Sequence, residues 1–149
     1  MQDAAHRFNN QLNVYRKAQG AKELQTHNPI WLVALNHCMW MRENKMLEHD
    51  EKRGTKYFTG KYPSERLKYV DAKLKYSALG ENIAHIDLLE DDIKATENLA
   101  EQLSKEFFGI WKKSKGHRQN MISKTFTHHA ICILKTGTRF YAVSIFYSK

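Results

Sequence analysis

The first segment of the chain alternates polar and apolar residues with the period of a helix. Phe8, Leu12 and Tyr15 are separated by four and then three positions, which places them on one helical face. Gly20 follows as a residue that commonly ends a helix. We therefore predict a helix from about Ala4 to Lys17, with one apolar face directed toward a core.

The second apolar segment has no wide polar face. Asn28-Pro29 supplies an N-cap residue and a proline in the first helical position, so we predict a helix from Pro29 to about Leu47. Its apolar residues occupy nearly every face, namely Ile30, Trp31, Leu32, Val33, Leu35, Cys38, Met39, Trp40 and Met41. A helix of this kind lies in the interior of a protein. All the tryptophans, including Trp111, are expected on buried faces.

The middle of the chain has no sustained period. The sequence YPSERL, residues 62–67, indicates a short helix that opens with a capping box. The sequence GENIAH, residues 80–85, is expected to form a turn before the next long element. That element is predicted to be a helix from Leu88 or Asp91 to Ser114, with acidic residues in its first turns and Gly116 as its C-terminal stop.

Two β-rich runs end the chain. Residues 130–135 and 139–147 are separated by Thr136-Gly137-Thr138, which is typical of a hairpin. The order of elements predicts an α+β or layered α/β fold in one domain covering residues 1–149. A chain of 149 residues with 42% hydrophobic residues is long enough to bury one such core.

Composition only partly restricts where the protein is located in the cell and whether its two cysteines form a disulfide. The longest apolar run, Ile30 to Leu35, is far too short to span a bilayer, and residues 1–7 lack the features of a signal peptide. The chain is then either cytosolic or the mature part of an exported protein. Cys38 and Cys132 lie within apolar patterns and are expected to be buried free thiols. A disulfide requires their helix and strand to pack side by side.

Charge is distributed unevenly along the chain, whose net charge is +8. Residues 107–149 carry basic side chains and no acid, whereas residues 87–106 are mainly acidic. We interpret these runs as solvated faces; the alternative is a basic surface for an anionic membrane or a nucleic acid. No zinc-finger spacing, RNP-like motif or phosphate-binding glycine loop is present, so no specific nucleic-acid partner is expected.

Three polar residues flank the predicted elements and are able to carry chemistry. His49 follows the buried helix, Glu81 follows Gly80, and His117 follows Gly116. Two imidazoles and a carboxylate suit a divalent metal ion, and they also suit acid–base work. Spacing alone does not decide between a joint site and three unrelated residues.

Three motifs in order give a more specific indication. Glu81 in GENIAH, His117 in FFGIWKKSKGHRQNMI and His49 in LNHCMWMRENKMLEHD together resemble the CAP superfamily of cysteine-rich secretory, antigen 5 and pathogenesis-related proteins. FNNQLNVYRKAQG is similar to the opening helix of that family, and YAVSIFY is similar to its closing strand. The resemblance covers nearly the whole chain and is greatest to bacterial SCP-like members.

The resemblance implies a three-layer α-β-α sandwich with a central antiparallel sheet. It also implies a surface cavity into which His49, Glu81 and His117 point as candidate ligands of zinc or another divalent cation. Ser114 stands where animal and plant members often carry a second glutamate, so the cavity set here is His49, Glu81, His117 and Ser114. The eukaryotic disulfides have no counterpart, which favours a bacterial-type member. Metal occupancy is expected to fall below about pH 6, as the imidazoles protonate.

Other polar residues receive structural interpretations. Three histidines are expected on the surface or in strands: His85, His128 and His129. Asn82 and Asn120 are expected to hold loops through bonds to the backbone. Arg66 and Arg118 are interpreted as solvated charges, although Arg118 is also placed to brace the motif loop.

The leading functional hypothesis is a secreted or cell-envelope binding protein with a His-Glu-His cavity for a divalent metal. The ligand is an unidentified small molecule, lipid or protein, and the basic C-terminal third favours an anionic envelope surface. One alternative is a hydrolase that uses Glu81 and His117, and another is a lipid- or sterol-binding protein. A Ser114-His117-Glu81 triad is disfavoured, because no nucleophile elbow surrounds the serine.

Overall fold

Three antiparallel strands form the centre of the molecule. The computed structural model describes all residues from Met1 to Lys149. Its elements are α1 (Gln2–Ala18), α2 (Asn28–Asn44), α3 (Pro63–Val70), β1 (Ala78–Asp87), α4 (Glu90–Ala95), α5 (Leu99–Lys113), α6 (Lys115–Ile122), β2 (His128–Thr136) and β3 (Arg139–Ser148). The strand order is β1-β3-β2, so the last strand lies between the other two.

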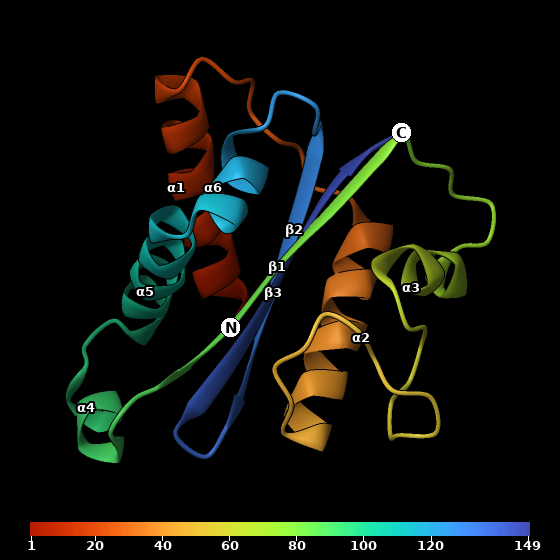
Figure 1. Cartoon of the computed structure of the whole chain (residues 1–149). Helices are drawn as coiled ribbons and strands as arrows, with labels where there is room; N and C mark the ends of the chain where they lie inside the picture. The colour runs from red at the N-terminus through yellow and green to blue at the C-terminus, as the bar shows by residue number, and fades with distance from the viewer.

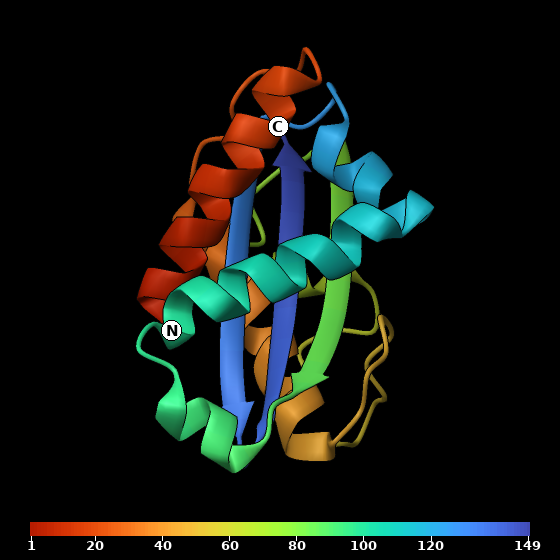
Figure 2. The same cartoon turned by 90° about the vertical axis from the view of Figure 1, so that its left-hand side faces the viewer.

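Helices cover both faces of this sheet. Figure 1 shows α1, α5 and α6 on one side and α2 and α3 on the other, and Figure 2 shows α1 and α5 crossing the first face. Each face has its own apolar core, with Phe8 and Trp111 in one cluster and Trp40 in the other. The expected three-layer α-β-α sandwich with a central antiparallel sheet is confirmed.

The GENIAH sequence forms a strand, which the sequence did not indicate. Residues 78–87 pair with β3 over their whole length, from Ala78 opposite Ser148 to Asp87 opposite Arg139. Glu81 therefore lies within a strand, and the expectation that it sits in a turn is wrong. The alternation of strands directs Glu81 and Ile83 to one face, and Ile83 belongs to the core formed with α2.

The long helix expected from residue 88 to residue 114 is interrupted. α4 ends at Ala95, and the Asn98 side chain accepts a hydrogen bond from the Glu101 amide at 3.0 Å to begin α5. Gly116 is not a helix stop, because α5 ends at Lys113 and α6 begins at Lys115. Ser114 turns the chain between them with an extended backbone. His117 consequently lies in the first turns of a new helix.

The two N-terminal helices lie close to their expected bounds. α2 begins one residue before Pro29 and ends three residues before Leu47, where Lys45 adopts a left-handed backbone conformation. Trp31 corrects one expectation, because its side chain lies on the outer face of α2 and is 37% exposed. The capping box of α3 is incomplete: the N-cap residue is Tyr62, while the Glu65 carboxylate accepts a bond from the Lys61 amide at 2.8 Å.

Several smaller expectations are confirmed. Cys38 and Cys132 are buried free thiols. His85, His128 and His129 all belong to strands, and His129 is buried. No helix has the length and the apolar composition required to cross a membrane.

Candidate functional site

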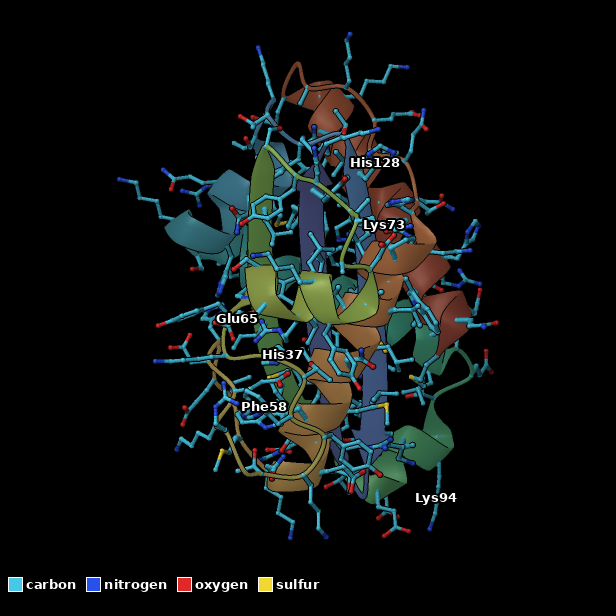
Figure 3. All side chains as sticks on the ribbon, turned by 90° about the vertical axis from the view of Figure 1, so that its right-hand side faces the viewer. His37, Phe58, Glu65, Lys73, Lys94 and His128 are labelled. Atoms are coloured by element: carbon cyan, nitrogen blue, oxygen red, sulfur yellow. The ribbon has the colours of Figure 1, made fainter.

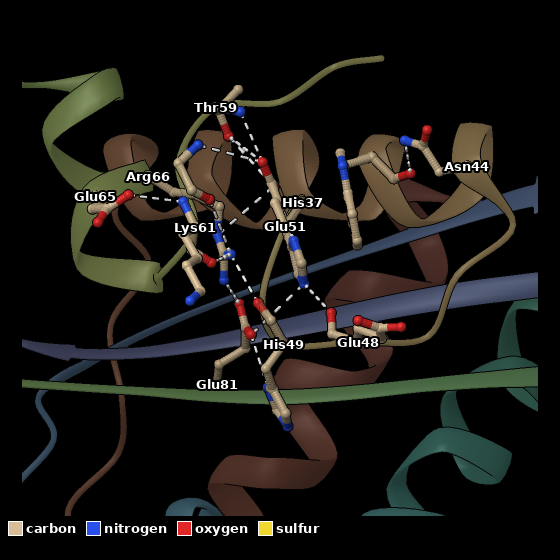
Figure 4. Close-up of polar contacts among 12 residues, drawn as sticks. His37, Asn44, Glu48, His49, Glu51, Thr59, Lys61, Glu65, Arg66 and Glu81 are labelled. Atoms are coloured by element: carbon tan, nitrogen blue, oxygen red, sulfur yellow. Dashed lines mark hydrogen bonds and ion pairs between the residues drawn. The ribbon is translucent and has the colours of Figure 1, made fainter. Parts of the chain in front are cut away.

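A buried ion pair joins α3 to the sheet. The Arg66 guanidinium donates a hydrogen bond from Nη2 to Oε2 of Glu81 at 2.6 Å, and both side chains are almost completely buried. Figure 4 shows this pair between α3 and β1. The interpretation of Arg66 as a solvated charge is therefore wrong. Its position within the apolar face of a short helix is the reason, since Leu67 beside it is also buried.

Arg66 also organises the loop between α2 and α3. Its Nη1 donates to the carbonyl oxygens of His49 at 2.9 Å and Lys61 at 3.0 Å. Gly60 permits this close approach, because a Cβ at that position would meet the Glu65 Cβ at 2.7 Å. The guanidinium thereby fixes the backbone of His49 relative to the carboxylate of Glu81.

Glu81 holds the ring of His49. His49 Nδ1 lies 2.9 Å from Oε1 of Glu81, and the His49 side chain is about half exposed. This hydrogen bond raises the pKa of His49. Burial raises the pKa of Glu81, but the bond from His49 and the charges of His37 and Arg66 together hold it below its ordinary value. Glu81 is thus an ionised acceptor, so Nδ1 of His49 carries a proton and Nε2 stays free.

Replacing Glu81 with glutamine is expected to lower the pKa of His49, because a neutral amide stabilises the imidazolium less than a carboxylate does. The raised pKa stabilises the folded state below the ordinary pKa of histidine, and this contribution disappears as the pH rises through the folded-state pKa. An NMR titration of the His49 ring in both proteins measures the change. The ring of His6, which contacts Asn10 on α1, is the control. An unchanged His49 titration would refute the role of Glu81.

A third histidine and a second glutamate complete the buried network. His37 on α2 is fully buried, with Nδ1 3.0 Å from Oε1 of Glu51 and Nε2 2.9 Å from the carbonyl oxygen of Glu48. Nε2 also lies 3.7 Å from Oε1 of Glu81. Figures 3 and 4 show His37 directed from α2 toward the loop and the sheet. Sequence reasoning identified neither His37 nor Glu51.

Hydrogen bonds and ion pairs connect the members of this network. Glu51 accepts a bond from the Thr59 amide at 2.7 Å. Both ring nitrogens of His37 lie within hydrogen-bond distance of oxygen atoms, one in the Glu51 carboxylate and one in the Glu48 carbonyl group. The buried Arg66 guanidinium lies near both carboxyl groups, with Nη2 2.6 Å from Oε2 of Glu81 and Nε 3.9 Å from Oε1 of Glu51. This pairing and the hydrogen bonds explain how these ionisable groups are tolerated in the interior.

α6 brings His117 to the same end of β1. The Asn82 side chain donates to the carbonyl oxygen of His117 at 3.1 Å, and the Asn120 side chain donates to the carbonyl oxygen of Glu81 at 3.4 Å. The two asparagines make the expected bonds to backbone, although they join a helix to a strand rather than holding loops. Gly80 leaves room for this contact, since a Cβ there would lie 3.1 Å from Oδ1 of Asn120.

The ring of His117 has unused bonding capacity. Its Nδ1 is buried and has no hydrogen-bond partner. Burial lowers the pKa of His117, and the charge on His49 lowers it further, so the two rings lie within electrostatic range. A buried nitrogen without a partner is costly, and a bound ion or water molecule is one way to satisfy it.

The structure shows neither the predicted cavity around these residues nor a cluster of three metal ligands. None of the principal cavities is lined by His49, Glu81, Ser114 or His117. No group of three His, Cys, Asp or Glu side chains lies close enough together to hold a metal ion. Both oxygens of Glu81 are already engaged by Arg66 and His49. The structure shows a half-exposed His49 bonded to a buried carboxylate, with His117 near enough for its pKa to respond to the charge on His49.

The same geometry limits what the residues do chemically. Glu81 is nearly inaccessible and each of its carboxylate oxygens already accepts a hydrogen bond, so it is poorly placed to take a proton from a substrate. Ser114 forms no hydrogen bond with His117, and its carbonyl oxygen accepts from the Arg118 amide at 2.8 Å. Glu81 is better suited to orient His49, in the manner of the carboxylates that support metal-binding or catalytic histidines.

Comparison with known proteins identifies the family. The model of the CAP family, described as the cysteine-rich secretory protein family, matches residues 10–147. The chain belongs to the CAP family. A search of curated proteins gave no significant match.

Three solved bacterial structures resemble this CAP domain. An extracellular protein containing an SCP domain from Bacillus anthracis has a TM-score of 0.72 and 21% identity, covering 98% of this chain and 40% of its own. An outer surface protein from Borrelia burgdorferi has a TM-score of 0.72 and 17% identity, covering 95% and 89%. A cysteine-rich secretory protein from Staphylococcus aureus has a TM-score of 0.63 and 13% identity, covering 99% and 39%. The chain thus spans less than half the length of the first and third proteins.

Proposed function

We propose that this CAP domain is an extracellular or cell-envelope binding module in which His49 and His117 hold a divalent cation. Zinc is the first candidate for this cation. The observation that carries the proposal is the buried, unpartnered Nδ1 of His117 within electrostatic range of His49. Neutral imidazole nitrogens are ordinary zinc ligands. Two protein ligands leave coordination positions for water or for a ligand, which a bound zinc ion polarises as a Lewis acid.

Glu81 supports the cation indirectly in this proposal, by holding the ring of His49. It accepts the proton of His49 Nδ1 and so leaves Nε2 free to bind. Arg66 in turn keeps Glu81 ionised and in place. The location rests on the relatives named above, one of which is described as extracellular and one as an outer surface protein.

Calorimetric titration with zinc chloride at neutral pH tests the proposal. We expect wild-type protein to bind one zinc ion, and Glu81→Gln to weaken this binding by about 10–100-fold, because the carboxylate behind His49 is lost. His49→Gln and His117→Gln are expected to abolish most of the binding. His6→Gln, a change at an exposed histidine of α1, is the control and leaves binding unchanged. Absence of wild-type binding, or full binding by His117→Gln, would disprove the metal site.

A further inference from the structure

The two edge strands of the sheet differ in how their outward-facing backbone groups are hydrogen-bonded. On the β1 edge, side chains satisfy the carbonyl oxygens that face away from β3. Trp111 Nε1 donates to the carbonyl oxygen of Ile83 at 3.2 Å, and Asn120 donates to that of Glu81 at 3.4 Å. This edge is closed by α5 and α6, as unpaired strand edges usually are in native proteins.

The β2 edge is closed only at its beginning. The segment before α2 runs parallel to it, with the Gln25 amide donating to Thr127 at 3.0 Å and the His129 amide donating to Gln25 at 2.9 Å. The chain then turns into α2 at Asn28. Beyond this point no further segment lies along the outer side of β2.

The next outward-facing backbone groups belong to Ile131 and Ile133. An antiparallel ladder alternates, so residues two and four positions after His129 direct their N–H and C=O groups to the same outer side. No hydrogen bond from outside the sheet reaches these groups. Both residues are 1% exposed, so water reaches these groups poorly, and unpaired backbone groups in this position are costly.

A groove follows this part of the strand between α1 and α2. Two hollows of about 180 Å³ and 320 Å³ share Gln2, Ala5, Trp31 and Ile131, and so form one continuous groove. Figure 2 shows β2 at the edge of the sheet, next to α1, with α2 behind it. The rim includes the exposed side chains of Trp31 and Met1.

The groove is apolar at one end and polar but uncharged at the other. The end near Leu134 is almost entirely hydrophobic, whereas Asn9, His27 and Asn28 line the opposite end. Neither hollow is lined by a lysine, arginine, aspartate or glutamate. A fatty acid would find no lysine or arginine for its carboxylate, and its chain would leave the strand amides unpaired.

We propose that an extended, uncharged peptide segment of a partner protein binds this groove as an additional strand beside β2. Such a segment supplies both donors and acceptors to Ile131 and Ile133, which no aliphatic ligand does. At about 3.3 Å per residue, pairing with these two residues requires a segment of about three to five residues. Trp31, whose exposure the sequence did not predict, forms a wall for its apolar side chains. The site is separate from His49 and His117.

The proposal is tested by NMR with a capped hexapeptide, acetyl-VTVTVT-amide, added to ¹⁵N-labelled protein at millimolar concentration. The Ile131 and Ile133 amide signals are expected to move downfield and to become protected from hydrogen exchange, while signals around His117 stay in place. The same peptide with N-methyl groups on alternate amides keeps its side chains but loses the pairing, and is expected to bind at least tenfold more weakly. Equal binding of the methylated peptide overturns the proposal.

A variant that fills the groove provides a second test. Ala5→Phe places a ring between α1 and β2 and is expected to weaken peptide binding at least tenfold. Val14→Phe, at a residue of α1 that is 71% exposed, is the matched control and leaves binding unchanged. Unmoved Ile131 and Ile133 signals in wild-type protein overturn the proposal. So does dodecanoate shifting these two signals when the peptide does not, because the groove is then a lipid site.

Discussion

Replacing Arg66 with leucine is expected to destabilise the protein more than any other single change in the candidate site. The substitution leaves Glu81 and Glu51 buried without the guanidinium that lies beside both of them. Removing one partner of a buried ion pair typically costs about 3–5 kcal/mol, because the remaining charge is desolvated and uncompensated. The loss of the bonds to the carbonyl oxygens of His49 and Lys61 adds to this cost.

Urea denaturation at neutral pH measures this effect. Arg66→Lys keeps the charge but loses the planar fork that reaches Glu81 and two carbonyl groups, so it is expected to be intermediate. Arg7→Leu is the control, since Arg7 forms only an exposed pair with Asp3. Such a pair contributes about 0–1 kcal/mol. A loss below about 1 kcal/mol for Arg66→Leu would refute the prediction that the buried Arg66–Glu81 ion pair is a main source of stability.

The fold was predictable wherever one face of an element is apolar. Phe8 and Leu12 locate α1 because its other face is solvated, and the hairpin of β2 and β3 follows from its β-branched and aromatic residues. β1 was not predicted because its sequence contains a glycine, a glutamate and a histidine, which interrupt the alternation of apolar residues typical of a strand. Its structure depends on β3, which lies more than fifty residues away in the sequence. Long-range pairing of this kind leaves little local trace.

The site was predictable only at the residues that belong to the sequence motifs. His49 and Glu81 were proposed from motifs, and the structure places them in hydrogen-bond contact. Arg66 was misinterpreted because an arginine on a short helix is ordinarily solvated. The burial of His37 was detectable from the sequence, because it shares one helical face with the buried Val33, Ala34 and Met41. The burial of Glu51 was not detectable from the sequence, because it depends on how the loop folds over α2.

His129 is expected to give the folded protein a pronounced sensitivity to acid. The ring is buried against Phe8 and Phe146, with Nδ1 2.7 Å from Oδ1 of Asn9 and Nε2 bonded to the Ser144 hydroxyl. Burial, with a smaller effect from the charge on Arg16, lowers the pKa of His129 to about 3. In the unfolded chain the ring instead protonates near its ordinary pKa of about 6.5.

The sign of the effect follows from this difference in proton binding. Between about pH 6.5 and pH 3 the unfolded state binds a proton at His129 that the folded state does not, so acid favours unfolding. Each pH unit in this range removes about 1.4 kcal/mol, which amounts to about 3 kcal/mol at pH 4. Stability above pH 7 is unaffected by this residue's titration.

His129→Gln isolates this contribution from that of the carboxylates. Glutamine is neutral at every pH and keeps polar contact with Asn9 and Ser144. It loses the packing of the ring against Phe8 and Phe146, so the variant is expected to be less stable than wild type at pH 8. The gap is expected to shrink by about 3 kcal/mol between pH 7 and pH 4, measured by denaturation at each pH. His6→Gln, at an exposed residue, should leave the wild-type pH profile intact. A gap that stays constant with pH would show that His129 protonates equally in both states, and that the buried ring gains a counter-charge or water on acidification.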